Sequence, residues 1–278
     1  MHPVANHLIQ LQELSLIRDE QQVTVGRAHL EQLDQSIAEM IEKLPPEVRT
    51  LYRKLKDKDA IVIAPVSEEV CAACGMRLPI SLVQAVRMER EVHSCPNCAR
   101  MMYWPEARVR GIGQRASRVG PQKAGISRFS SHTLMIPELE SEKADGVIRE
   151  LAYRLRDEGF VDKADELVEA ALRREAIVST AVGNGLAFPH VRSVEGGGLA
   201  LALGISRKGV IFDGPDGKTV KMIFFLAIPT AASAFYLKLL SGLTTTFADP
   251  EARKALMAEK EQEKVWKALV KATRATIK

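Results

Sequence analysis

The sequence lacks any apolar stretch long enough to cross a membrane. Its longest uncharged run, between Lys221 and Lys238, is shorter than the roughly 20 residues that a spanning helix needs, and Pro229 interrupts it. The first residues, MHPVANHLIQLQEL, lack the basic start, the apolar core and the small-residue cleavage site of a signal peptide. We therefore expect a cytoplasmic protein without membrane insertion.

An excess of charge of one sign is also absent. The net charge of +4 is mild for 278 residues, and it does not by itself indicate a nucleic-acid partner, because a binding face needs clustered charge. The hydrophobic share of 46% and the charged share of 27% are those of an ordinary soluble protein. The length suggests about two domains, and no internal repeat is visible.

Cysteines are few, and all four lie within 28 consecutive residues as Cys71-Ala-Ala-Cys74 and Cys95-Pro-Asn-Cys98. Two C-x-x-C pairs separated by twenty residues can supply four thiolates to a tetrahedral zinc ion. A redox dithiol is the weaker interpretation, because it needs one pair in a βαβ context. Four sulfurs leave no open position, so we expect one structural Zn²⁺ per chain. His93 could compete as a ligand, but a surface histidine is the better interpretation.

Residues 1–60 predict an α-helical hairpin or coiled coil. Apolar residues at three- and four-residue steps predict one long helix over residues 3–43, and Pro45-Pro46 ends it before a second, short helix. Two interpretations stay open: the apolar face packs on its own domain, or it forms a homodimer through the N-terminal helix. The apolar seam consists of Leu30, Leu33, Ile37, Met40 and Leu44.

A zinc ribbon is expected over residues 61–105, and a basic flexible linker over residues 106–130. Residues 106–128 carry six basic residues against one acid, with scattered glycine and serine and no periodic apolar positions. Such a segment cannot bury enough apolar surface to order itself. It is usually solvated, and contact with nucleic acid is the alternative.

Residues 131–278 alternate helical patterns with short apolar runs at Leu199–Ile205 and Val220–Ile228. This alternation predicts an α/β sandwich, a mixed β-sheet with helices on both faces. Asp249-Pro250 predicts a helix start, with a capping carboxylate followed by proline at the first helical position. The chain as a whole is therefore expected to be multi-domain.

A glycine loop and a histidine follow the second predicted helix of this region. The loop Gly183-Asn184-Gly185 could form a nest of backbone N–H groups for an anion. It does not fit a dinucleotide fingerprint, because Phe188 stands where the third glycine is needed. A lone G-x-G pattern is common and predicts little by itself.

His190 directly follows Pro189, which fixes the backbone and predicts a rigid imidazole at a strand end. A neutral imidazole can accept a phosphoryl group near neutral pH. Arg174 and Arg192 are candidates to hold phosphate oxygens. From these residues alone a structural or surface histidine is the more common case.

The stretch EEVCAACGMRLPISLVQAVRMEREVHSCPNCARMMYWP, residues 68–105, resembles the four-cysteine zinc-ribbon family, whose members carry the ribbon behind a coiled-coil hairpin. Gly75 follows the first pair, as a zinc knuckle prefers, but Ala99 follows the second pair where glycine is commoner. If that position needs a positive φ, alanine costs roughly 1 kcal/mol. The resemblance implies contact with nucleic acid or with a protein.

Residues 131–278 resemble the IIA domain of the fructose–mannitol and nitrogen-regulatory class of the sugar phosphotransferase system. The resemblance implies that His190 accepts phosphate from the phosphocarrier protein HPr, with Arg174 in support. It rests on the pattern R-E-x(4)-T-x-x-G-N-G-x-A-x-P-H, matched by Arg174, Glu175, Thr180, Gly183, Asn184, Gly185, Ala187, Pro189 and His190.

Tyr236 departs from that family, which often has a second histidine at the corresponding helix start. A tyrosine can donate a hydrogen bond to a phosphate oxygen but cannot add an imidazolium charge. The leading function is therefore a regulatory phosphocarrier. The alternatives are a non-catalytic IIA-like binding module whose ribbon binds nucleic acid or protein, and a IIA component of sugar uptake with a separate permease.

Overall fold

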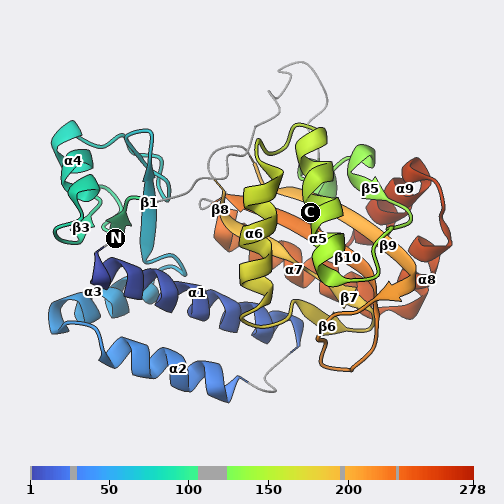
Figure 1. The fold of residues 1–278 in the computed structure, drawn as a ribbon, viewed down its shortest axis with the longest axis horizontal. Coiled ribbons are helices and arrows are strands. Elements are labelled where there is room, and N and C mark those ends of the chain that lie inside the picture. The colour runs from blue at the N-terminus through green and yellow to red at the C-terminus, as the bar shows by residue number, and fades with distance from the viewer. Residues whose placement is uncertain (1, 26–29, 106–123, 195–197, 230–231) are drawn as a thin grey trace. The chain divides into compact units, whose positions relative to one another are not determined.

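The computed structural model describes residues 2–25, 30–105, 124–194, 198–229 and 232–278, and it divides the chain into two compact units, Met1–Arg108 and Val109–Lys278 (Figure 1). None of the helices described there is both long enough and apolar enough to cross a membrane. Most of the predicted linker, residues 106–123, lies outside the described residues. Its last part contains helix η1 (Gly125–Arg128), in which Ile126 is buried.

The first unit begins with two helices, α1 (Pro3–Thr24) and α2 (Glu31–Glu42). Nε2 of His7, near the start of α1, lies 2.8 Å from the carbonyl oxygen of Met40, near the end of α2, so the helices are antiparallel. The prediction of one continuous helix through this region was wrong. The sequence between the two helices contains Gly26, and glycine is a poor helix former.

A four-stranded sheet in the order β2-β1-β4-β3 completes this unit. Gln12 of α1 joins the helices to it: the amide oxygen accepts from the main-chain N–H of Ile63 at 2.9 Å, and the amide nitrogen donates to the carbonyl of Ile63 at 3.0 Å. Leu8 and Leu11 of α1 share a buried cluster with Ile63 of the sheet, so the apolar face of α1 packs on its own unit, and the homodimer stays a prediction. The other elements are α3 (Pro46–Lys56), β1 (Ile63–Ser67), β2 (Val70–Cys71), α4 (Ile80–Met88), β3 (His93–Ser94) and β4 (Met101–Tyr103).

The second unit alternates helices and strands, as its sequence predicts. Asp249 caps α8, since its carboxylate accepts from the N–H of Glu251 at 3.0 Å and Pro250 takes the first helical position. The elements in order after η1 are η2 (His132–Leu134), β5 (Met135–Ile136), α5 (Ala144–Asp157), α6 (Ala164–Glu175), β6 (Ala181–Gly183), β7 (Leu186–Ala187), β8 (His190–Val194), β9 (Ala200–Val210), β10 (Val220–Pro229), α7 (Ser233–Ala248), α8 (Pro250–Ala258) and α9 (Gln262–Thr273).

The sheet of this unit is mixed, which confirms that part of the predicted fold. Its order is β5-β9-β10-β7-β6, and β8 also pairs with β10. Strands β9 and β10 are antiparallel, whereas β7 and β8 both run parallel to β10 and follow each other along one edge of it. Leu186 pairs with Met222 and His190 pairs with Leu226, so this register fixes where the histidine lies.

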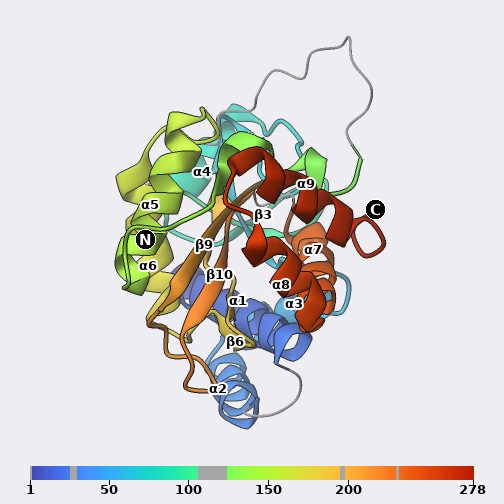
Figure 2. The same ribbon diagram turned by 90° about the vertical axis from the view of Figure 1, so that its right-hand side faces the viewer.

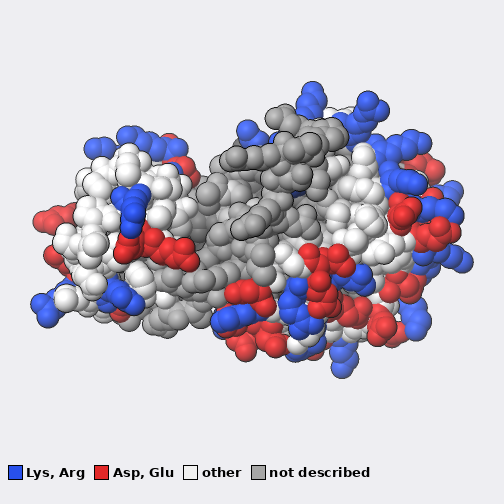
Figure 3. Space-filling view, turned by 90° about the horizontal axis from the view of Figure 1, so that it is seen from above, with Lys and Arg blue, Asp and Glu red and all other residues white. Residues whose placement is uncertain are grey.

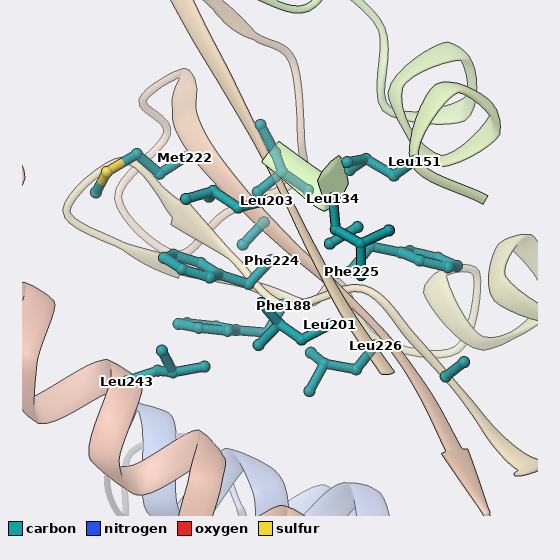
Figure 4. Packing of buried hydrophobic residues seen from close by; sticks show 14 of the residues in the cluster. Leu134, Leu151, Phe188, Leu201, Leu203, Met222, Phe224, Phe225, Leu226 and Leu243 are labelled. Atoms are coloured by element: carbon teal, nitrogen blue, oxygen red, sulfur yellow. The ribbon is translucent and has the colours of Figure 1, made fainter. Parts of the chain in front are cut away.

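Aromatic and aliphatic side chains of β9, β10 and the adjoining strands form the core of this unit (Figure 4). The rings of Phe188 and Phe224 stack with their centroids 5.3 Å apart, and Phe224 meets Phe247 of α7 at the same distance. Burying each such side chain fully contributes about 1.5–3 kcal/mol. In Figure 2, α5 and α6 lie on one side of β9 and β10, and α7, α8 and α9 lie on the other.

Candidate functional site

His190 is the first residue of β8, the strand-end position that the sequence predicts. The carbonyl oxygen of Pro189 accepts a hydrogen bond from the N–H of Leu226 at 3.0 Å, which ties the preceding residue to β10. The imidazole is buried, with 2% of the residue exposed. A reaction at this ring therefore requires its surroundings to open.

The hydrogen bonds at Nδ1 fix the tautomer of His190. This nitrogen lies 3.0 Å from the carbonyl oxygen of Phe188. A carbonyl oxygen only accepts, so Nδ1 must carry the proton and donate it. The lone pair of the neutral ring then lies on Nε2, which is the nitrogen able to act as a nucleophile.

Tyr236, in the first turn of α7, is brought to the same ring. Its hydroxyl oxygen lies 3.2 Å from Nδ1 of His190, and the two ring centroids are 5.2 Å apart. Burial raises the pKa of the Tyr236 phenol to about 12, although the charges of Arg192 and Arg174 act in the opposite direction. The phenol therefore stays neutral near pH 7.

Two arginines surround this pair. The guanidinium carbon of Arg192 lies 5.2 Å from the centre of the Tyr236 ring. Arg192 also follows His190 by two residues in β8, so both side chains point to one face of the strand. Arg174 is buried at the end of α6, where Nη1 donates to the carbonyl of Val178 at 2.7 Å. The structure thus brings Arg174, His190, Arg192 and Tyr236 into one neighbourhood.

Glu175 supports this neighbourhood from α6. Its carboxylate accepts from the hydroxyl of Ser179 at 2.8 Å and from both the N–H and the hydroxyl of Thr180 at 2.9 and 2.6 Å. The carbonyl of Thr180 in turn accepts from the N–H of Phe188 at 3.1 Å. Phe188 is the residue whose carbonyl orients the histidine. Sequence reasoning quoted Glu175 and Thr180 only as parts of a pattern and assigned them no role.

The structure does not bring the glycine loop to the histidine. Residues 183–185 all have positive φ, at 84°, 56° and 74°, and they turn between β6 and β7. The carbonyl of Gly185 bonds to Lys221, whereas His190 pairs with Leu226, five residues or about 16 Å farther along β10. The N–H of Asn184 donates to the carboxylate of Asp216 at 3.2 Å, so the chain itself supplies an anion there.

The four cysteines form a second site in the first unit. Their sulfur atoms all lie within 4.8 Å of one another, with 3.9 Å between Cys71 and Cys98 and 3.8 Å between Cys74 and Cys95. A tetrahedron of sulfurs about 2.3 Å from a central zinc has edges of about 3.8 Å, so the arrangement fits the ion. His93 is not part of this cluster, and its ring lies 3.7 Å from Glu91.

In both knuckles, the residue that follows the second cysteine of the pair has a positive φ. Gly75 has a φ of 74°, and Ala99, at the equivalent place, has a φ of 62°, so the condition on which the predicted cost of the alanine depends is met. Burial raises the pKa of the Cys71 thiol to about 12 and also raises the pKa of Cys95. A zinc ion held by these cysteines would displace their protons, and its charge would compensate the buried thiolates.

Family models match both units of the chain. The family described as "Phosphoenolpyruvate-dependent sugar phosphotransferase system, EIIA 2" matches residues 129–272, and the C4-type zinc ribbon domain matches residues 70–102. A fructose-specific EIIA component from Haloferax volcanii is 30% identical over 138 residues, which are 49% of this chain and 90% of that protein.

Two further relatives cover the same half of the chain. A fructose-specific EIIABC component from Bacillus subtilis is 30% identical over 137 residues, 49% of this chain, and the chain spans only 21% of that protein's length. The crystal structure of the nitrogen regulatory protein IIA-Ntr from Neisseria meningitidis is 29% identical, and the match covers 51% of this chain and 97% of that one with a TM-score of 0.47.

Proposed function

Because the chain belongs to the phosphoenolpyruvate-dependent sugar phosphotransferase system EIIA 2 family, we propose that it is a regulatory phosphocarrier that accepts a phosphoryl group on Nε2 of His190. The observation that carries the proposal is the bond from Nδ1 to the carbonyl of Phe188, which leaves the lone pair on Nε2. A cytoplasmic location and an HPr-type phosphohistidine donor are parts of the same proposal.

The transfer is a single displacement at phosphorus. The lone pair of Nε2 forms a new N–P bond as the N–P bond of the donor's phosphohistidine breaks, and the electron pair of that bond returns to the donor's imidazole. The guanidinium groups of Arg174 and Arg192 supply positive charge for the three phosphoryl oxygens, and Tyr236 can donate a hydrogen bond to one of them. Positioning and charge are most of what such a transfer needs.

The zinc ribbon is the proposed contact for a partner, either a protein or a nucleic acid. A zinc ion held by Cys71, Cys74, Cys95 and Cys98 would supply structural energy to this small unit, since four thiolates complete its coordination. Phosphorylation of His190 adds a dianionic group to the other unit. We propose that this change of charge regulates what the ribbon binds.

The test supplies labelled phosphoenolpyruvate, enzyme I and HPr to the full chain. We expect label on the wild type and on His132→Ala, a control histidine in the same unit, and no label on His190→Ala. The label should be lost in acid and kept in base, as expected of a phosphohistidine. An unlabelled wild type, or label retained by His190→Ala, would remove the proposal.

One observation favours a second candidate, a binding module that has lost the transfer. His190 is 2% exposed and its Nδ1 contacts Tyr236, so the ring is closed to a donor in this conformation. This candidate predicts an HPr complex, detectable by titration, without label on the chain. The third candidate, sugar uptake with a separate permease, predicts onward transfer from labelled chain to a IIB domain, which the first two do not.

A further inference from the structure

A cavity of about 690 Å³ lies in the second unit, away from the histidine neighbourhood, between η1, α9 and the residues that follow α9. Its volume is within the range of 300–1,000 Å³ that is usual for small-molecule sites. Uncharged side chains line most of it. They come from Ile126 of η1, from Trp266 and Val270 of α9, and from Ile277 beyond α9.

The spacing of residues in α9 explains why the cavity is apolar inside and basic at its rim. Trp266 and Val270 are four residues apart, so they share one face of the helix. Lys267 and Lys271 form the adjacent row, which Arg274 continues just after the helix ends. In Figure 3, lysine and arginine atoms lie at the end of the unit that carries α9, interspersed with aspartate and glutamate atoms.

The positive charge at this rim is only partly neutralised. The ammonium of Lys267 lies 3.9 Å from the carboxylate of Glu263. Among the described residues, Lys271, Arg274 and Lys278 have no carboxylate within ion-pair distance. Three cations beside an apolar cavity make the site complementary to an anion that carries an apolar body.

Hydrogen bonds hold the walls of the cavity in place. Nε of Arg128 donates to the carbonyl of Gly125 at 3.3 Å, and its Nη2 donates to the main-chain oxygen of Lys278. The same guanidinium lies over the ring of Phe129, 5.0 Å from its centroid. These contacts join η1 to the segment after α9.

We propose that this cavity binds an amphiphile with a medium-length alkyl chain and one anionic head, either a carboxylate or a phosphate monoester. A nucleotide fits less well, because a base needs polar partners at its edge. Among the lining residues, the uncharged side chains with a polar group are Thr273, whose hydroxyl already donates to the carbonyl of Leu269 at 2.8 Å, and Trp266, whose indole N–H can donate but not accept. The chain's own residues 106–123 are unsuitable, because they are basic and would meet a basic rim.

Fluorescence of Trp266 gives a direct test. The chain has two tryptophans, so Trp104→Phe leaves Trp266 as the reporter. In this background we expect laurate and dodecyl phosphate to change the emission saturably, and dodecanol to bind at least about tenfold more weakly. Reversing the rim with Lys271→Glu and Arg274→Glu should weaken laurate about tenfold, whereas the matched reversal Lys254→Glu on α8 should change it less than twofold. Added salt should weaken laurate but not dodecanol.

Two further measurements separate this proposal from the proposed phosphotransfer and from binding to a lipid surface. His190→Ala should bind laurate as the wild type does, so a failed phosphotransfer assay leaves this result untouched. Vesicles of anionic phospholipid should bind no better than vesicles of neutral phospholipid. The proposal is overturned by an emission that soluble amphiphiles do not change, by equal affinity in the reversed-rim variant, or by binding to anionic vesicles alone.

Discussion

Exchanging the glycine and the alanine of the two zinc knuckles should change zinc affinity in opposite directions. Ala99 and Gly75 take equivalent left-handed conformations, with φ of 62° and 74°. A residue with a Cβ pays about 1–2 kcal/mol in that region, and glycine loses about 0.5–1 kcal/mol more chain entropy on folding. The difference predicts that Ala99→Gly stabilises the folded ribbon by about 0.5–1 kcal/mol.

Gly75→Ala is the matched opposite change, and it isolates the backbone effect. A Cβ placed on Gly75 would have no heavy atom within 4 Å, so the substitution adds conformational strain without a clash. We expect a loss of about 0.5–1 kcal/mol. The two sites lie in different knuckles, so the stability of the ribbon that carries both substitutions should be close to that of the wild type.

Competition with a chromophoric chelator measures the effect locally. Small structural zinc sites couple zinc binding to folding, so we expect the stability change to appear in the dissociation constant for zinc. At 1.4 kcal/mol per factor of ten, we expect about two- to fivefold tighter zinc for Ala99→Gly and a similar weakening for Gly75→Ala. Unchanged or weakened zinc binding in Ala99→Gly would refute the assignment of strain to Ala99.

Three further predictions follow from the second unit. Burial raises the pKa of Tyr236 to about 12 from 10.0, so the unfolded chain loses the phenolic proton at a lower pH than the folded chain does. The free energy of unfolding should therefore fall by up to ~3 kcal/mol between pH 10 and about 12. Tyr236→Phe should remove this part of the alkaline decrease in stability. Glutamine at position 175 cannot accept all three hydrogen bonds of the carboxylate, so Glu175→Gln should lower the free energy of unfolding in urea by about 1–3 kcal/mol. It should also slow the phosphoryl labelling of His190. An unchanged labelling rate would contradict a positioning role for Glu175. Asp249→Ala removes the cap of α8 and should cost about 1 kcal/mol in thermal unfolding, with Asp249→Asn restoring most of it.

Much of the fold was predictable because its signals are local. The four-cysteine spacing, the strands at Leu199–Ile205 and Val220–Ile228 and the cap at Asp249 each depend on neighbouring residues, and the structure contains all of them. The helical pattern at the N-terminus was also local, but apolar spacing alone did not place the break between Thr24 and Glu31.

The arrangement of the histidine neighbourhood was only partly predictable. The glycine loop and His190 lie within eight residues in sequence, yet they pair with opposite parts of β10, and this register is set by long-range strand pairing. The part played by Asp216, which meets the loop from 32 residues away, is equally invisible to local patterns. The approach of Tyr236 to His190 was predictable only from a family resemblance.

The closed imidazole of His190 sets a thermodynamic condition on any donor. A protein that binds only an open conformer has its apparent affinity divided by the fraction of molecules that are open, so an open fraction of about 1% weakens binding about a hundredfold. The contact between Tyr236 and the ring is one of those that bury the imidazole in this structure. Anything that shifts the ring from buried to exposed, a ligand or a distant substitution, would then control the rate of the proposed phosphorylation without touching Nε2.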